Sequence, residues 1–85
     1  MSATLDRVLV QIRAVYENKG VTPPALSPAS VLGQEIGLES LDLAEIVVRL
    51  ENEFGFDPFA EGVPEGVRTI GDLTSLYAND GSAGN

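Results

Sequence analysis

The chain of 85 residues contains no histidine, no cysteine and no tryptophan. Without histidine there is no Ser-His or Cys-His nucleophile pair and no histidine-based zinc site. Without cysteine there are neither disulfides nor thiolate metal ligands, which fits a reducing cytoplasm. The glycine-rich phosphate loops GxGxxG and GxxxxGK[ST] are missing as well. These absences argue against an enzyme that works with its own side chains and against a bound metal.

Basic residues are scarce, since five Lys and Arg stand against thirteen Asp and Glu, for a net charge of −8. Nucleic acid is therefore not an expected partner, because neutralising phosphates needs cations. Between Glu35 and Glu65 there are nine acidic residues and one basic residue, Arg49. Such a patch is either a solubilising surface or a docking surface for a basic protein.

Long apolar runs are also absent, and none approaches the ~20 residues that a membrane span needs. The N-terminus lacks the pattern of a signal peptide. We therefore expect a cytoplasmic protein without a membrane partner. Its length corresponds to one domain, too small for a deep internal active site.

Three segments show the apolar spacing of helices, and no segment shows a convincing strand pattern. The segments are residues 2–18, 40–54 and 70 to about 78. Thr69 to Asp72 resembles a capping box at the start of the last helix. Residues 80–85 have nothing to bury, so we expect a domain over 1–79 and a flexible tail over 80–85.

The connection over residues 21–39 is long, and its prolines exclude a regular helix through its first half. Residues 30–33 have the composition for one short helical turn. Glycine and proline in residues 60–68 leave room for at most a short additional helix. The predicted fold is all-α, a small bundle of three to four helices with a long first loop.

The middle helix, residues 40–54, has more apolar surface than one small core needs. Its inner stripe contains Leu43, Ile46, Val47, Leu50 and Phe54. Roughly opposite lies a second stripe, made of Leu41, Ala44 and Val48. A helix in so small a domain has one core to face, so the second stripe should face water or a partner. Ser40 stands at the N-terminal end of that outer side.

A serine at a helix start is most often an N-cap. As a nucleophile, Ser40 would need a base, which this chain does not offer but another protein could supply. If Ser40 were modified, a phosphate there would meet free backbone N–H groups and the positive end of the helix dipole. On chemistry alone, both interpretations stay open.

The segment Ile36-Gly37-Leu38-Glu39-Ser40-Leu41, followed by Leu50-Glu51-Asn52-Glu53-Phe54, resembles the acyl carrier proteins and the related peptidyl carrier domains. Their signature is L-G-x-D-S-L and then a helix that ends in L-E-x-x-F. Residues 67–73 look like the start of that family's last helix, and the match covers about residues 3–79. The resemblance implies a fold of acyl-carrier type.

The resemblance further implies that Ser40 carries 4′-phosphopantetheine, transferred from coenzyme A by a separate phosphopantetheinyl transferase. The arm's thiol would hold an acyl or aminoacyl group as a thioester, and the carrier itself would not be an enzyme. We expect a free-standing, monomeric carrier that serves loading enzymes and synthases of a polyketide, fatty-acid or hybrid secondary (nonribosomal peptide) pathway. The alternative is a carrier-like interaction module that is not pantetheinylated.

By the same resemblance, partner enzymes would bring basic patches to the middle helix and dock there. The implied docking residues are Glu39, Leu41, Asp42, Ala44, Glu45, Val48 and Glu51. Glu39 stands where the family usually has aspartate, so the charge is kept but its hydrogen bond would differ. The Gly- and Pro-rich stretch over residues 56–68 favours a secondary pathway over the housekeeping one.

Overall fold

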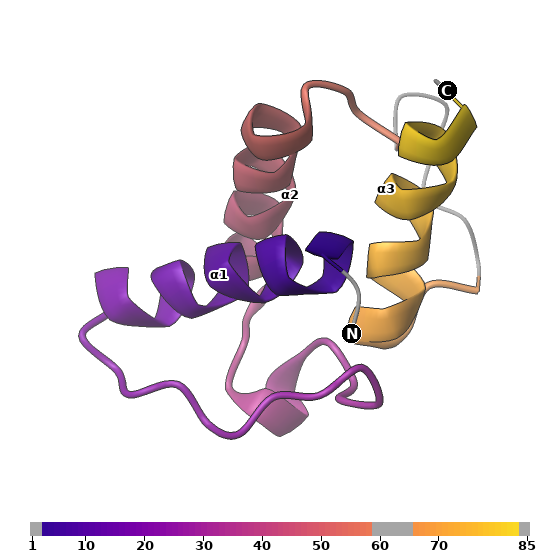
Figure 1. Ribbon diagram of the computed structural model, residues 1–85. Helices are drawn as coiled ribbons and strands as arrows, with labels where there is room; N and C mark the ends of the chain where they lie inside the picture. Colours follow the sequence, from indigo (N-terminus) through magenta and orange to yellow (C-terminus); the bar gives the residue numbers. More distant parts are fainter. Residues whose placement is uncertain (1–2, 59–65, 84–85) are drawn as a thin grey trace.

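The computed structural model describes residues 3–58 and 66–83, with side chains as far as residue 78. Three α-helices and one short 3-10 helix are present in these residues: α1 (Ala3–Asn18), η1 (Gln34–Ile36), α2 (Ser40–Phe54) and α3 (Ile70–Ala83) (Figure 1). The predicted all-α bundle with a long first loop is confirmed. None of the described helices is long and apolar enough to cross a membrane. The short helix considered over residues 60–68 falls largely on 59–65, outside the described residues.

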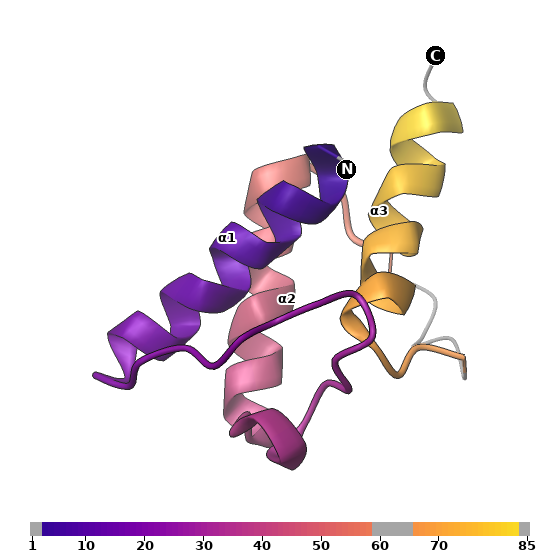
Figure 2. The ribbon, with the colours of Figure 1, turned by 60° about the horizontal axis from the view of Figure 1, so that its bottom comes forward.

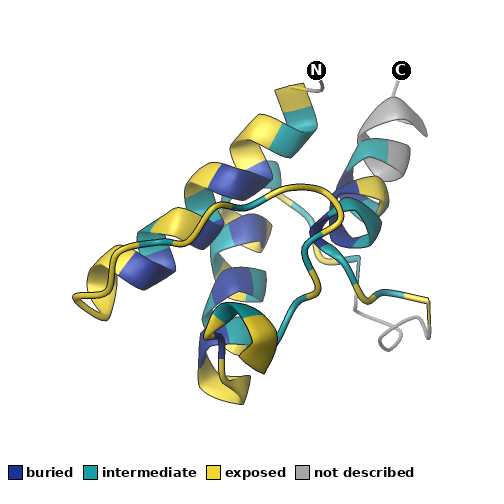
Figure 3. Cartoon of the chain, turned by 90° about the horizontal axis from the view of Figure 1, so that it is seen from below, coloured by how far each residue is buried: buried dark blue, intermediate teal, exposed yellow. Residues whose placement is uncertain are grey.

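The core lies where α1 packs against both α2 and α3. The buried positions lie on the sides of the helices that face one another, and the exposed positions lie on the outer sides (Figure 3). On α2, Ile46 and Leu50 are fully buried, whereas Leu43, Val47 and Phe54 are half-buried. Removing one such large side chain from water stabilises the fold by about 1.5–3 kcal/mol. The predicted inner stripe of α2 therefore does hold the bundle together.

One end of the core is closed by aromatic rings. The Phe54 and Tyr77 rings stack with centroids 4.8 Å apart, and Phe56 lies 5.4 Å from Tyr77. The Arg7 guanidinium covers Phe54 at 4.2 Å and donates to the Glu53 carboxylate and to the Glu53 carbonyl at 2.7 and 2.8 Å. Burial raises the pKa of Tyr77 to about 12. This cluster joins the first turns of α1 to the last turn of α2.

The first loop crosses the molecule from the end of α1 to the start of α3 before it returns to α2 (Figure 2). The Pro28 carbonyl accepts a hydrogen bond from the Gly71 N–H at 2.8 Å, and the Ser30 carbonyl accepts one from the Ile70 N–H at 3.0 Å. These two N–H groups lie at the start of α3 and have no partners within the helix. Gly71 suits this close approach, because a Cβ there would lie 3.1 Å from the Pro28 oxygen, tighter than most Cβ contacts. We call residues 28–32 the strap.

Two expectations about the helices need correction. The helical turn expected over residues 30–33 is wrong, because Val31 instead pairs with Thr69 in an isolated antiparallel bridge. The single turn lies further on, at Gln34–Ile36. The last helix does not end near residue 78 but continues to Ala83, past the 79/80 boundary. The apolar pattern stops at Tyr77, so the final turn leaves no periodic signal. The flexibility assigned to residues 80–85 stays a prediction.

Candidate functional site

Ser40 is the first residue of α2, and it is exposed. The N-cap position belongs to Glu39, whose backbone is extended at φ −101° and ψ 175°. The interpretation of Ser40 as the helix cap is therefore wrong. Within the described part of the chain, the Ser40 hydroxyl makes no hydrogen bond. Its oxygen is available to another molecule.

Asp42 fixes the N-cap of α2 at Glu39, one residue before Ser40. Its Oδ2 atom accepts the Glu39 N–H at 2.9 Å and the Lys19 ammonium at 2.7 Å. These two bonds, the backbone bond foremost, lower the pKa of Asp42. Asp42 is only 9% exposed. The expectation that Asp42 lies on the outer docking face is thus wrong, because its carboxylate turns back to the helix start and to α1.

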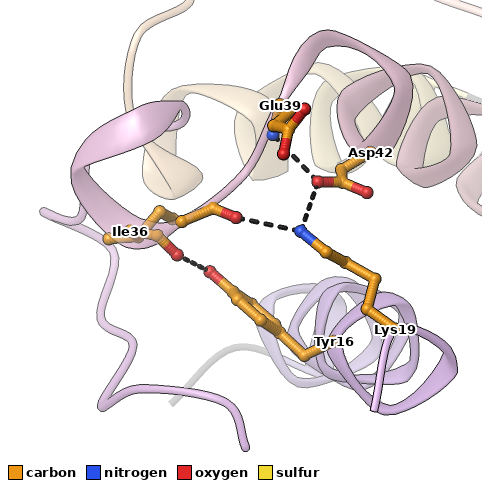
Figure 4. Close-up of polar contacts among 6 residues, drawn as sticks. Tyr16, Lys19, Ile36, Glu39 and Asp42 are labelled. Carbon is orange, nitrogen blue, oxygen red and sulfur yellow. Dashed lines mark hydrogen bonds and ion pairs between the residues drawn. The ribbon is translucent and has the colours of Figure 1, made fainter. Parts of the chain in front are cut away.

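The last turn of α1 binds the segment that leads to Ser40 (Figure 4). The Tyr16 hydroxyl donates to the Ile36 carbonyl, and Lys19 Nζ donates to the Gly37 carbonyl at 3.1 Å. The hydrogen bond to Asp42 is the main cause of a raised pKa of Lys19. We call Tyr16 and Lys19, with these acceptors, the α1 clamp. No pattern in the sequence pointed to the clamp, because Tyr16 and Lys19 are far along the chain from the segment they hold.

The clamp and the core fix the chain on both sides of the serine. Gly37 adopts the left-handed region at φ 79°, and Leu38 directly after it is buried at 1% exposure. The next three residues stand out from the surface, with Leu41 84% exposed. Residues 39–41 therefore form a short exposed segment that displays Ser40 and is held at both ends. We call this segment the crest.

The outer stripe of α2 lies on the surface as predicted. Leu41, Ala44 and Val48 are exposed, Val48 by 54%. Glu39 and Glu51 are exposed beside them. Glu45 differs from these acids, since its carboxylate accepts hydrogen bonds from Arg49 at 3.1 Å and Asn18 at 3.2 Å. Part of the acidic flank is thus neutralised within the molecule.

Two grooves adjoin the crest and share Leu43. The first has a volume of about 640 Å³ and lies between the η1 turn and the start of α2, with Ser40 in its wall. The second, about 610 Å³, lies between α2 and the strap, and Val31, Leu32 and Val47 line it. The lining of the second groove is almost wholly apolar. A chain that leaves Ser40 therefore has an apolar groove within reach.

Comparison with known proteins agrees with this arrangement. A family described as "Phosphopantetheine attachment site" matches residues 11–76. The chain is 32% identical over 59 residues to an acyl carrier protein of Chlamydia muridarum (strain MoPn / Nigg), which covers 69% of this chain and 75% of that protein. Its structure is similar to the solution structure of MacpD, an acyl carrier protein from Pseudomonas fluorescens involved in mupirocin biosynthesis. That similarity has a TM-score of 0.78 and 38% identity, over 91% of this chain and 69% of MacpD.

The chain belongs to the phosphopantetheine-binding acyl carrier protein family. The expected family and fold type are thereby confirmed. Proteins of this family are carriers rather than catalysts, and phosphopantetheine is the group that is attached to them. The resemblance read from Ile36–Leu41 and the L-E-x-x-F run at the end of the middle helix pointed to the right family.

Acidification tests the electrostatics at the start of α2. Asp42 has a lowered folded-state pKa, and so has Asp72, which accepts the Arg68 and Thr69 N–H groups. As the pH falls below about 5, towards the unfolded-state pKa of about 3.9, the unfolded chain therefore binds more protons than the folded chain. Stability should be constant above that range and decrease towards pH 3. Urea unfolding of wild type and Asp42→Asn at pH 7 and pH 3 measures it. The variant should lose less stability on acidification, and an equal loss would contradict the assignment.

Proposed function

We propose that Ser40 is the attachment residue and that this protein presents acyl groups on a 4′-phosphopantetheine arm to partner biosynthetic enzymes. The observation that carries the proposal is the Ser40 hydroxyl itself. It is exposed, it is not used as a helix cap, and it lies on a crest held at both ends. The serine motif of the family falls on this residue.

The surroundings of Ser40 suit a phosphodiester. The N-terminus of α2 offers backbone N–H groups and the positive end of the helix dipole, which stabilise an added phosphate. The transfer forms a bond between Ser40 Oγ and the phosphorus of the phosphopantetheine half of coenzyme A. The bond from that phosphorus to the bridging oxygen breaks, and adenosine 3′,5′-bisphosphate leaves with the electron pair. The hydroxyl proton passes to a base of the transferase, since this chain has no histidine.

When attached, the arm supplies a thiol that holds the cargo as a thioester. What this chain contributes is placement and recognition. We propose the outer stripe, Leu41, Ala44 and Val48, as the surface that meets partner enzymes, with Glu39 and Glu51 attracting their basic patches. Asp42 has no direct part in this surface, whereas Glu45, whose Oε2 accepts from Arg49 and Asn18, meets a partner through Oε1.

The groove between α2 and the strap favours an acyl cargo over an aminoacyl one. Its lining is apolar, and an amino group placed there would lose water without gaining a hydrogen bond. The similarity to MacpD, which serves mupirocin biosynthesis, supports a role in a secondary pathway. The remaining alternative is an interaction module that is never modified. Modification of Ser40 by a transferase distinguishes the two.

The attachment site is tested with a transferase of broad specificity and coenzyme A. Wild type should gain the mass of one phosphopantetheine, and Ser40→Ala should gain nothing. Ser75→Ala, an exposed serine on α3, is the matched control and should be modified as wild type is. Intact-mass spectrometry measures all three. An unmodified wild type, or an equal gain in Ser40→Ala, would refute the proposal.

The docking surface is tested with two valines of nearly equal exposure, Val48 at 54% on α2 and Val10 at 57% on α1. Both Val→Ser variants should keep their stability within about 0.5 kcal/mol, as exposed positions do. Val48→Ser should raise the KM of the transferase for the carrier by roughly fivefold, about 1 kcal/mol of lost contact, and Val10→Ser should not. Steady-state kinetics at two salt concentrations measures both. Equal effects of the two variants would remove the outer stripe from the docking surface.

The cargo groove is tested by loading the arm with acetyl or octanoyl groups. Octanoyl should raise the melting temperature above that of the acetyl form, because each buried CH₂ contributes up to about 0.8 kcal/mol. Val47→Gln, in the groove wall, should abolish the difference between the two loaded forms. Calorimetry of each form measures this. An equal melting temperature for both loaded wild-type forms would mean that the groove does not take the chain.

A further inference from the structure

We propose that Lys19 is a positioning residue for the modification of Ser40. Its ammonium group binds the chain on both sides of Ser40 and holds it in the conformation that the transferase recognises. The inference rests on the proposed function of Ser40 and adds a residue from another helix, 21 positions earlier in the sequence.

The geometry that carries the inference is the position of one atom. Lys19 Nζ lies 3.1 Å from the Gly37 carbonyl, before the serine, and 2.7 Å from Asp42 Oδ2, after it. A single donor group therefore closes the segment from Gly37 to Asp42 into a short arc, and Ser40 within this segment is exposed. Among the described residues no other side chain bridges these two positions.

Partial burial makes the arc firm. The Lys19 and Asp42 side chains are only 29% and 12% exposed, so salt screens their attraction less than at an open surface. Tyr16, one turn earlier on α1, holds the Ile36 carbonyl in the same way. The crest is thus held by α1, a helix anchored in the core by Ile12 and Val15. The Ser40 segment takes its rigidity from outside α2.

Removal of the ammonium should loosen this segment without unfolding the bundle. Asp42 would keep its bond to the Glu39 N–H, so α2 would still begin at Ser40. The Gly37 carbonyl would lose the Lys19 bond, and the arc could open on that side. The core side chains of α1, α2 and α3 make no use of Lys19. The effect should therefore be local.

A local loosening matters because phosphoryl transfer requires the attacking oxygen in line with the leaving group. A misplacement of the reacting atom by about 1 Å can cost roughly 100-fold in rate. If the free carrier already holds Ser40 in place, the transferase does not have to order it. A flexible crest would be bound with similar contacts but would reach the reactive geometry less often.

The test compares Lys19→Met, directly after α1, with Arg13→Met, the same change at an exposed cation within α1. Modification by a transferase with coenzyme A is followed by intact mass, well below the melting temperature of each variant. Lys19→Met should lower kcat/KM by roughly 10- to 100-fold, mainly through kcat. Arg13→Met should stay within about threefold of wild type. Hydrogen exchange of the unmodified proteins should be faster at Leu38 in Lys19→Met but not in Arg13→Met.

Further variants separate positioning from direct contact with the transferase. Asp42→Asn should reproduce the slower modification, and the double variant should be no slower than the worse single one. Lys19→Arg, which can donate to both oxygens, should recover part of the rate. Additive losses, or a slower rate with unchanged exchange, would show that Lys19 touches the transferase instead.

Failure of the inference can be told apart from failure of the proposed function. A rate for Lys19→Met equal to that of Arg13→Met, with Ser40→Ala unmodified, would overturn the inference alone. Modification of Ser40→Ala at the wild-type level would overturn the proposed function and the inference with it.

Discussion

The bond from Lys19 to Asp42, with its second branch to the Gly37 carbonyl, is the contact on which the site depends. It occupies the carboxylate that also receives the Glu39 N–H, so the start of α2 is set by a group tied to α1. Since Glu39 takes the cap position, the Ser40 hydroxyl is released from a role that serines at helix starts usually have. The Ser40 hydroxyl, our proposed attachment point, is thus available because Glu39 and Asp42 form the helix start between them, and Lys19 ties that start to α1.

What the sequence predicted well is what depends on neighbours along the chain. The spacing from Leu43 to Phe54 indicated both the middle helix and its inner face, and the Thr69–Asp72 capping box is present with bonds of 3.1 Å in both directions. The clamp was missed because Lys19 and Asp42 are 23 positions apart, and no periodicity links them. Asp42 was placed on the wrong face because spacing alone cannot show that a side chain near a helix start turns back to the cap.

The loop and the last helix show the same limit. Backbone bonds of the strap to the start of α3 decide the shape of residues 28–32, and local composition around Ser30 suggested a helical turn instead. The final turn of α3 up to Ala83 lies beyond Tyr77, the last apolar residue of the helical pattern, and so gives no periodic signal in the sequence. The family motif compensated for part of this, because it marked Ser40 as more than a cap when chemistry alone left two interpretations.

The charges of the molecule divide between holding the fold and meeting a partner. Three ion pairs join described residues: Arg7 with Glu53, Lys19 with Asp42, and Arg49 with Glu45. They use three of the five basic residues inside the molecule. Each pair is neutral, so the ten other acidic and two other basic residues still carry the net charge of −8. In the docking we propose, Glu39 and Glu51 meet cations of the partner, and such exposed pairs contribute little individually and weaken with salt. This arrangement suits a carrier that passes from one enzyme to the next. Its serine is held firmly, while the charge attraction that brings an enzyme to it stays weak.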